Sequence, residues 1–422
     1  MGKKSTLLTA LLFTFLLIAC GSSSGTSSEP APLDLNYVPE NPYTVNNYQL
    51  EPLSGKTAFA YFNDEKIFSG WNLGNTLDSW SSGSGHETIW GNPFVNQELM
   101  NGVKAAGFNI IRIPITWMGH IGKAPDHRIT PYRLERAAEV VEMAHKAGLK
   151  VIINLHHDGS TPQPGKDDGW LSIYKAYKNS KEDERISYQF ARVWDQIAAY
   201  FTNYGDWLMF ESMNEIHDGG WGWSTEFKMF PNLQMDILNK WNQIFTDRVR
   251  ASGGNNASRY LIIPSYCTVP EHTLSPSFKL PQDSAPNKLV VTFHYYDPYE
   301  FGIKGSRPSW GTQADKEKVD HDFAPFKTQY IDKNIPVIIG ECGAVKQIYS
   351  DKTIETQARQ SRADYISHVF TTAKKYKLVP VYWDNGLTTG NGEKFGLLDR
   401  KTGKPNSQES EALIKIMINA VK

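Results

Sequence analysis

The chain has 422 residues, of which 40% are hydrophobic and 21% charged, and its formal net charge at pH 7 is −1. This balance is typical of a globular protein and offers no basic surface for nucleic acid. The length fits two or three average domains, but single α/β barrels also reach it.

The N-terminus has the pattern of an export signal. Lys3 and Lys4 precede an apolar run over 7–19 that is too short to span a bilayer as a retained helix. The run ends in Leu-Ile-Ala-Cys, which resembles the bacterial lipoprotein box. We therefore expect residues 1–19 to be a lipoprotein signal peptide and Cys20 to be lipidated. An ordinary signal peptide with a chance cysteine is the alternative.

The segment after Cys20 is rich in Ser, Gly and Pro and almost without apolar residues, which is typical of a flexible tether. We expect residues 20–56 to form a lipid-anchored tether with an N-terminal extension, and residues 57–422 to form one folded domain. The chain is then an exported bacterial lipoprotein of the cell envelope, on the outer membrane or cell surface, which meets the membrane through its anchor only.

Eight short apolar, β-branched runs recur from residue 68 onward. In chain order they cover 68–75, 109–117, 150–157, 208–215, 259–267, 289–296, 336–344 and 379–386. Helical patterns fill most of the gaps, as over 130–147 and 186–203. Strands that are apolar on both faces and alternate with helices predict a (β/α)8 TIM barrel rather than an open doubly wound sheet. The fifth unit is the weakest, with only 271–278 for its helix.

The connections differ at the two ends of the expected strands. Turns from helix to strand are tight, and Gly107, Gly148 and Gly205 are expected to end the helices before strands two, three and four. Loops from strand to helix are long and rich in aromatic residues: Trp80, Trp90, Trp170, Tyr174, Tyr177, Trp221, Trp223, Tyr299, Phe301 and Trp310. These loops build the face of a barrel that carries active sites, and exposed rings there suit a flat ligand such as a sugar. Any single ring can instead pack within its loop.

Two cysteines remain beyond Cys20. Cys267 and Cys342 fall on expected strands five and seven, which are not neighbours in a barrel, so we expect two free, buried thiols. No paired Cys and His spacing for zinc occurs, and we expect no cofactor and no metal.

Two carboxylates stand at the ends of separate apolar runs. Glu341 follows Val-Ile-Ile-Gly, and Glu215 ends the run that starts at Leu208. A pair of carboxylates on separate strand ends is the arrangement that glycoside hydrolysis needs, with one as acid/base and the other as nucleophile.

Further polar residues gather at the expected strand ends: Arg112, His156, His157, Asn214, His294, Tyr296 and Trp383. A single His beside a strand is more often structural than catalytic. A charge inside an apolar run needs a partner, however, so Arg112 implies a nearby anion, for which Glu341 is the obvious candidate. Arg112 would then favour the ionised form of Glu341, while repulsion between the two carboxylates would keep the proton on Glu215.

Seven segments make a family resemblance specific. GWNLGNTLD, RIPITW, LHHD, MNE, HYYDP, GECG and YWDNG occur in this order on strands one, two, three, four, six, seven and eight. Together they resemble glycoside hydrolase family 5 of clan A, most closely its bacterial endoglucanase and xyloglucanase branch, over about residues 57–420. The resemblance implies a catalytic domain that acts by double displacement on β-1,4-glucosidic bonds within cellulose-like glucans, mixed-linkage glucan or xyloglucan.

The resemblance also implies roles for the matching residues. Glu215 resembles the acid/base and Glu341 the nucleophile. The others would surround the reacting sugar: Arg112 and Tyr296 beside the nucleophile, His156, Asn214 and His294 along the subsite, Trp383 as its stacking platform, and Asn75 and His157 as further substrate contacts. Asn214 can donate to the sugar 2-hydroxyl.

Other functions stay open on the sequence. An endo-β-1,4-mannanase would use the same catalytic set, because the subsite loops decide the polymer. A metal-dependent barrel hydrolase would use His156, His157, Asp158 and His294, although no His-x-His opens strand one. A non-catalytic glycan-binding lipoprotein would be expected to lack one of the two carboxylates. We expect a monomer, and neither the preferred glucan nor the tolerance of xylose branches follows from the sequence.

Overall fold

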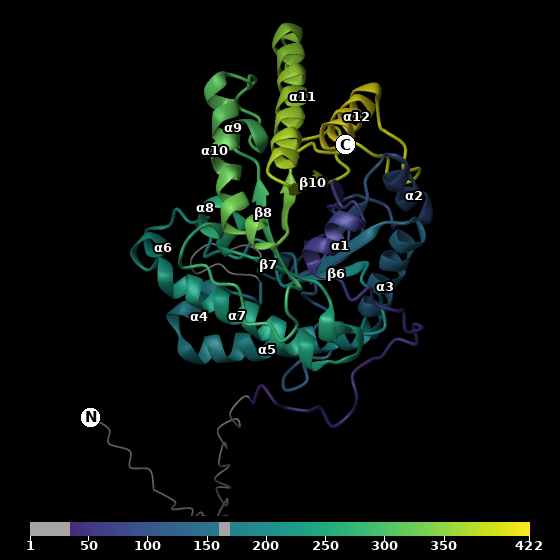
Figure 1. Cartoon of the computed structure of the whole chain (residues 1–422), viewed down its shortest axis with the longest axis vertical. Helices are drawn as coiled ribbons and strands as arrows, with labels where there is room; N and C mark the ends of the chain where they lie inside the picture. The colour runs from purple at the N-terminus through teal and green to yellow at the C-terminus, as the bar shows by residue number, and fades with distance from the viewer. Residues whose placement is uncertain (1–33, 160–168) are drawn as a thin grey trace, which may run out of the picture.

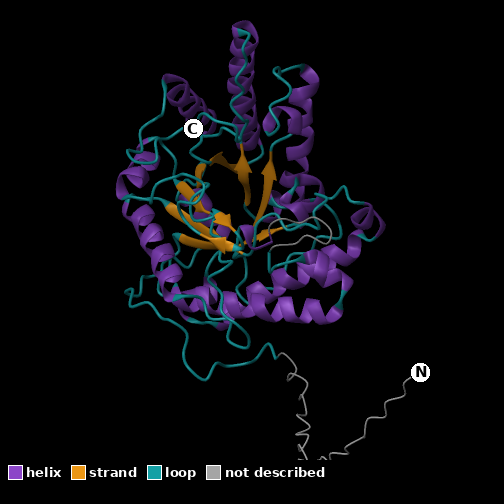
Figure 2. Cartoon of the chain, turned by 180° about the vertical axis from the view of Figure 1, so that it is seen from behind, coloured by secondary structure: helices purple, strands orange, loops and turns teal. Residues whose placement is uncertain are grey.

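The computed structural model describes residues 34–159 and 169–422. Within them, eight parallel strands close into a barrel in the order β1-β10-β9-β8-β7-β6-β5-β4. Their bounds are β1 Gly70–Leu73, β4 Ile110–Ile113, β5 Lys150–Asn154, β6 Leu208–Glu211, β7 Leu261–Pro264, β8 Leu289–Tyr295, β9 Val337–Cys342 and β10 Leu378–Asp384. Each strand falls on one of the eight predicted runs, and Figure 2 shows the strands in the middle of a ring of helices. The predicted (β/α)8 TIM barrel is confirmed.

The helices cover the outside of the barrel (Figure 1). In the described residues they are α1 Ala58–Asp64, α2 Gln97–Ala105, α3 Pro131–Lys146, α4 Ile173–Lys178, α5 Ser180–Tyr200, α6 Thr225–Met229, α7 Pro231–Ala251, α8 Pro270–Thr273, α9 Tyr299–Gly302, α10 Gln313–Gln329, α11 Lys352–Lys375 and α12 Gln408–Val421. Helices α3 and α5 confirm the two predicted helical patterns. The fifth unit is indeed the weakest, since α8 has only 4 residues.

Glycine ends two of the helices as expected. Gly107 and Gly148 follow α2 and α3 with φ angles of +103° and +83°, the left-handed region in which a glycine costs little. The prediction for Gly205 was wrong, because α5 ends at Tyr200 and Gly205 lies in the turn beyond it. The Gly205 N–H instead donates to a carboxylate oxygen of Glu51 at 2.8 Å.

Helix α1 closes one end of the barrel. Its buried Ala58, Tyr61 and Phe62 share an apolar cluster with residues from the first halves of the strands, among them Ile110 and Val290. The amino-terminal end of the barrel is therefore filled, and the carboxyl-terminal ends of the strands are the face that remains for a site.

The N-terminal extension, residues 34–56, lies against the outside of the barrel. Arg192 of α5 donates to the Leu35 carbonyl at 2.8 Å, and the Tyr48 ring stacks on Tyr204 with centroids 3.9 Å apart. Near its end, the Glu51 carboxylate accepts hydrogen bonds from the turn between α5 and β6. The predicted signal peptide, Cys20 and the Ser-rich tether up to residue 33 lie outside the described residues.

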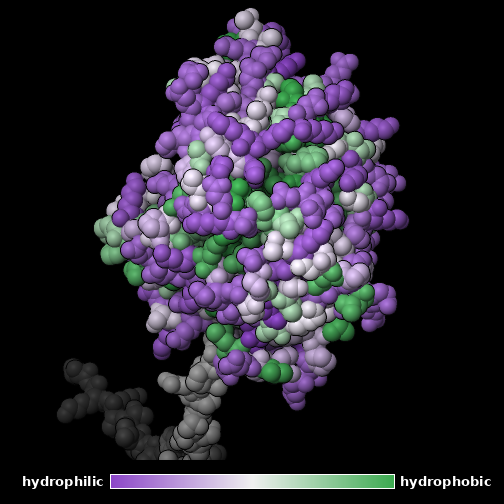
Figure 3. Space-filling view, in the orientation of Figure 1, coloured by the Kyte–Doolittle hydropathy of each residue, from purple (hydrophilic) through white to green (hydrophobic). Residues whose placement is uncertain are grey.

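A hairpin of β2 (Trp80–Ser81) and β3 (Ser84–Gly85) was not predicted, because two-residue strands carry no periodic pattern. Cys342 lies in β9 as predicted, whereas Cys267, expected on strand five, lies in a short 3-10 turn just after β7. Both are buried and free, which confirms the prediction of two free, buried thiols. Among the described helices, none has the length and apolar character needed to cross a bilayer. The face drawn in Figure 3 is largely hydrophilic.

Candidate active site

The carboxyl-terminal ends of the strands gather the predicted polar residues in one place. Arg112 lies in β4, His294 in β8, Glu341 in β9 and Trp383 in β10, all of them buried. Glu215 follows β6 by four residues. These strands are parallel, so their carboxyl ends meet at one end of the barrel, opposite α1.

Arg112 is the fully buried centre of the site. Its Nη1 donates to Glu341 Oε1 at 2.8 Å, which confirms the predicted ion pair. Its Nε donates to Glu211 Oε2 at 2.7 Å, and its Nη2 donates to Asn214 Oδ1 at 2.8 Å. Asn72 accepts a further bond from Nη1. The guanidinium thus faces two carboxylates and two amide oxygens, which together offset the cost of burying it.

Glu211 was missed in the sequence. It ends β6, is buried, and accepts from Asn154 Nδ2 at 2.8 Å as well as from Arg112. The signal was present, because an acidic residue inside the apolar run Leu-Met-Phe-Glu needs a partner just as Arg112 does. Glu211 holds the guanidinium through Nε, whereas Glu341 holds it through Nη1.

Glu341 is fixed through both of its oxygens. Arg112 contacts Oε1, and the Tyr296 hydroxyl donates to Oε2 at 2.9 Å. Burial raises the pKa of Glu341, while the neighbouring His294, Arg112 and Tyr296 act to lower it. His156 Nε2 lies 3.9 Å from Oε1. With both oxygens held by donors, the carboxylate has a single orientation, which a nucleophile requires.

Glu215 has a different environment. Its Oε1 lies 2.7 Å from His294 Nδ1. Burial raises the pKa of Glu215 to about 7, with Arg112 lowering it and Glu211 raising it. Burial also lowers the pKa of His294 to about 4, so the imidazole is neutral at pH 7. Glu215 therefore retains its proton up to neutral pH, as a general acid must.

The two carboxyl groups stand at a separation that decides the chemistry. Single oxygens of Glu215 and Glu341 and a ring nitrogen of His294 all lie within 4.8 Å of one another. Retaining glycosidases place their carboxyl groups about 5–5.5 Å apart, whereas inverting ones need about 6.5–9.5 Å to admit a water. The pair is thus suited to double displacement.

The segment that carries Glu215 is held from the next strand of the barrel. Three consecutive residues after β7 each contact it: Thr268 Oγ1 donates to the Asn214 carbonyl at 3.2 Å, Cys267 N donates to the Ile216 carbonyl at 3.0 Å, and Tyr266 Oη accepts from Asp218 N at 3.0 Å. Cys267 and Thr268 both have positive φ angles, of 54° and 52°. Such backbone costs about 1–3 kcal/mol per residue and persists where the surroundings fix it.

The remaining predicted contacts include a row of three neighbouring rings. Trp383 and His156 have near-parallel rings with centroids 5.9 Å apart, and His157 lies edge-on to His156 at 4.5 Å. Asn75 has a φ of +55° in the loop after β1. Its backbone N–H donates to Asp78, which sequence reasoning did not single out. The structure therefore brings all ten predicted residues to one end of the barrel, and their catalytic and binding roles stay predictions.

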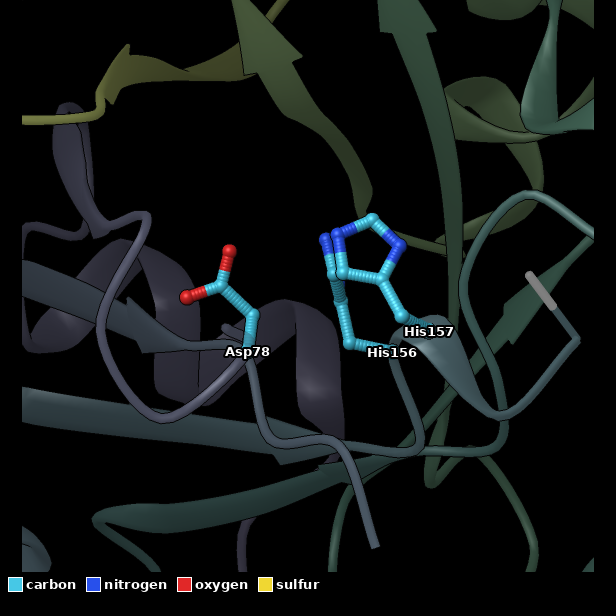
Figure 4. Close-up of side chains that lie close together, drawn as sticks. All are labelled: Asp78, His156 and His157. Carbon is cyan, nitrogen blue, oxygen red and sulfur yellow. The ribbon is translucent and has the colours of Figure 1, made fainter. Parts of the chain in front are cut away.

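The carboxylate of Asp78 lies beside the paired imidazoles of His156 and His157 (Figure 4). One atom from each of the three lies within 4.8 Å of the others. Both carboxylate oxygens of Asp78 already accept backbone N–H groups, from Asn75 at 2.9 Å and Thr76 at 2.6 Å. Asp78 therefore shapes the loop that presents Asn75.

The ligand set of the metal-dependent alternative is not brought together. Both carboxylate oxygens of Asp158 are occupied elsewhere, since they accept from the Trp117 N–H at 3.0 Å and the Trp170 indole at 2.6 Å, and His156 and His157 lie with Asp78 instead. His294 lies with Glu215 and Glu341 instead. In the part of the chain that the structure describes, the arrangement thus fits two acting carboxyl groups better than that metal site.

The ten loop aromatics differ in exposure, and five of them are half-buried: Trp80, Trp90, Trp170, Tyr174 and Tyr177. Trp221, Trp223 and Tyr299 are 50%, 74% and 58% exposed. Phe301 and Trp310, expected in the exposed set, are buried; Trp310 packs edge-on against Tyr365 of α11 at 5.2 Å. These two belong to the packing of the loop after β8 and not to a binding surface.

Comparison with known proteins identifies the family. The family model described as Cellulase (glycosyl hydrolase family 5) matches residues 74–388. The chain belongs to glycoside hydrolase family 5. This confirms the resemblance seen in the sequence and makes the protein a glycoside hydrolase of the cellulase type.

Similar family 5 proteins extend over most of the chain. Endoglucanase A of Paenibacillus barcinonensis is 36% identical over 353 residues, which cover 79% of this chain and 83% of that protein. A xyloglucan-specific endo-beta-1,4-glucanase of Bacteroides ovatus is 35% identical over 371 residues, covering 83% of this chain and 68% of the relative. The solved structure of a broad specificity endoglucanase from Bacteroides salanitronis has a TM-score of 0.79 and 38% identity, covering 90% of this chain and 99% of that one.

Proposed function

We propose that this family 5 enzyme cleaves β-1,4-glucosidic bonds inside glucan chains and retains the anomeric configuration. The main support is that single oxygens of Glu215 and Glu341 lie within 4.8 Å of each other. The two groups also differ in their partners, because Glu341 is held by Arg112 and Tyr296 whereas Glu215 lies beside His294. Relatives named as endoglucanases and as a xyloglucan-specific endoglucanase support glucan as the polymer and do not favour mannan.

The proposal gives each carboxyl group a task. Glu341, held by Arg112 and Tyr296, attacks C1 of the sugar, while Glu215 gives its proton to the departing glycosidic oxygen. In the second step water attacks C1 of the glycosyl-enzyme, and the Glu215 carboxylate takes the proton of that water.

Asn214 stabilises the same steps through its amide. Its Oδ1 accepts from Arg112, and a guanidinium can only donate, so the NH2 group is on the other side of the amide. That group is left to donate to the 2-hydroxyl of the reacting sugar, a bond that strengthens in the transition state.

A substrate panel tests the proposal. We expect reducing sugar from carboxymethylcellulose, mixed-linkage glucan and xyloglucan, and little from xylan or mannan. Because the exposed rings of Trp221 and Tyr299 suit an open cleft, viscosity should fall well before much reducing sugar appears. Faster release from mannan than from any glucan would favour the mannanase, and glucose as the sole early product would indicate an exo-acting pocket.

We also propose that the enzyme is held on the bacterial envelope through acylated Cys20. The support is the Leu-Ile-Ala-Cys sequence with the Ser-rich segment after it. A single acyl chain binds a membrane only marginally, whereas several chains anchor stably. The substitution Cys20→Ser should release soluble, active enzyme from the membrane fraction. Wild-type enzyme that is already free in the medium, without a lipid adduct by mass spectrometry, would exclude the anchor.

A further inference from the structure

The topology defines where the leaving group must lie. In the closed order of the barrel, three strands separate β10 from β6 on either side, so Trp383 and the Glu215 segment come from opposite sides of the ring. The reacting sugar is expected over Trp383, and the acid protonates the oxygen of the leaving group. The leaving-group part of the glucan therefore extends toward the loop that follows β6.

One tryptophan of that loop packs against a buried histidine. The Trp221 ring lies over the ring of His217, with centroids 3.9 Å apart and planes inclined by 31°. His217 is buried and comes two residues after Glu215, whereas the Trp221 side chain is 50% exposed. One face of the indole is thus covered by a neighbour of the acid, and the ring keeps exposed surface.

The loop has little freedom to move this ring. Asp218 accepts from Ser224 Oγ at 2.6 Å, Gln234 Nε2 at 3.0 Å and Gly220 N at 3.0 Å. Trp221 itself has a φ of +50°, a conformation that a tryptophan keeps only where its surroundings enforce it. The hydrogen bonds from Thr268, Cys267 and Tyr266 described above fix the preceding segment as well. The indole therefore has a fixed position relative to Glu215.

We propose that Trp221 is the stacking platform for the glucosyl unit on the leaving-group side of the scissile bond. The inference rests on the proposed function and adds a binding site to it. A sugar ring has an apolar face, and covering that face with an indole removes apolar surface of both from water. The same site receives an acceptor sugar when the glycosyl-enzyme is transferred to a carbohydrate instead of water.

Trp223 supplies a matched control. It lies on the same loop and is 74% exposed, but the Lys228 ammonium stands 5.0 Å from the centre of its ring. Its ring is paired with a lysine of α6 and not with a residue beside Glu215, so this residue is an exposed tryptophan of the same loop without that link to the acid. The substitution Trp223→Ala should therefore leave kcat/KM nearly unchanged on mixed-linkage glucan and on β-cellobiosyl fluoride.

The test compares a substrate that has a leaving-group sugar with one that has none. Mixed-linkage glucan places sugar units on the leaving-group side of the scissile bond, whereas β-cellobiosyl fluoride has only fluoride there. Trp221→Ala should lower kcat/KM on the glucan about tenfold, the effect of losing the apolar contact of one sugar face, and change it less than about twofold on the fluoride. Trp221→Phe should recover part of the loss. Transfer from the fluoride to added cellobiose should need a higher acceptor concentration in Trp221→Ala.

Each outcome is decisive. Equal losses on both substrates would mean that Trp221 acts through Glu215 or the fold and would overturn the platform. An unchanged kcat/KM on the glucan would overturn it too. Wild-type enzyme that hydrolyses neither substrate would instead refute the proposed function, which keeps the two failures distinguishable.

Discussion

Replacing Glu341 with alanine is expected to abolish turnover of every substrate, because no covalent intermediate can then form. Replacing Glu215 should lower kcat on a polysaccharide about 10²–10⁴-fold, the usual worth of a general acid. Glu215→Ala should nevertheless form the glycosyl-enzyme readily from an activated aryl β-glycoside, whose leaving group departs without a proton. Initial rates on both substrates, with product anomers followed by NMR, give the measurement.

Azide separates the roles of the two carboxyl groups. As a nucleophile that needs no general base, it should speed the slow second step of Glu215→Ala and give a β-glycosyl azide. With Glu341→Ala it should give at most the α-azide. A β-azide from the Glu341 variant alone would exchange the two assignments, and an inverted first product from the wild type would refute double displacement.

Removing Glu211 should have the second largest effect. Glu211 is buried and contacts Arg112. In Glu211→Ala the guanidinium therefore keeps Glu341 and loses the second of the two carboxylates that it contacts. Breaking a buried ion pair from one side costs about 3–5 kcal/mol of the free energy of unfolding. Chemical denaturation measures the loss, and a change under about 1 kcal/mol would mean that water replaces the carboxylate.

The variant Glu211→Gln isolates the charge. A glutamine oxygen can still accept from Arg112 and Asn154, so this variant should be far more stable than Glu211→Ala. In the wild type, kcat/KM should fall as pH rises through about 7, where Glu215 loses its proton. The Glu211 charge raises the pKa of Glu215, so Glu211→Gln should move this alkaline limb to lower pH. A limb that stays in place or moves up would contradict the assignment.

The barrel could be predicted because its strands are covered on both faces. Runs such as Val-Ile-Ile-Asn and Val-Ile-Ile-Gly are apolar throughout, and each one is a strand. The hairpin of β2 and β3 could not be predicted, because its pairing depends on tertiary contacts of the loop. Which loop rings are exposed also depends on distant packing: Trp310 is buried by Tyr365, which lies 55 positions further along the chain.

The site was predictable where a charge stands in an apolar run. Arg112 required an anion, and Glu341 is one of its partners. Glu211 carried the same signal, but the sequence could not show which side of β6 faces the guanidinium, since that depends on strand register, here Asn154 beside Glu211. The contacts that hold the Glu215 segment from Tyr266 to Thr268 join positions about 50 apart and leave no local pattern.

The N-terminal extension decides where a shortened enzyme can safely begin. A gene cut at residue 57, or at residue 74 where the family match starts, would expose the surfaces that Leu35 and Tyr48 cover on α5 and on Tyr204. It would also leave the Trp207 indole and the Gly205 N–H without the Glu51 carboxylate that they contact. A cut at 74 would in addition remove both α1 and the barrel strand β1, and would open the apolar interior of the barrel to water. The junction for a purification tag or a foreign export signal therefore belongs just before Asp34.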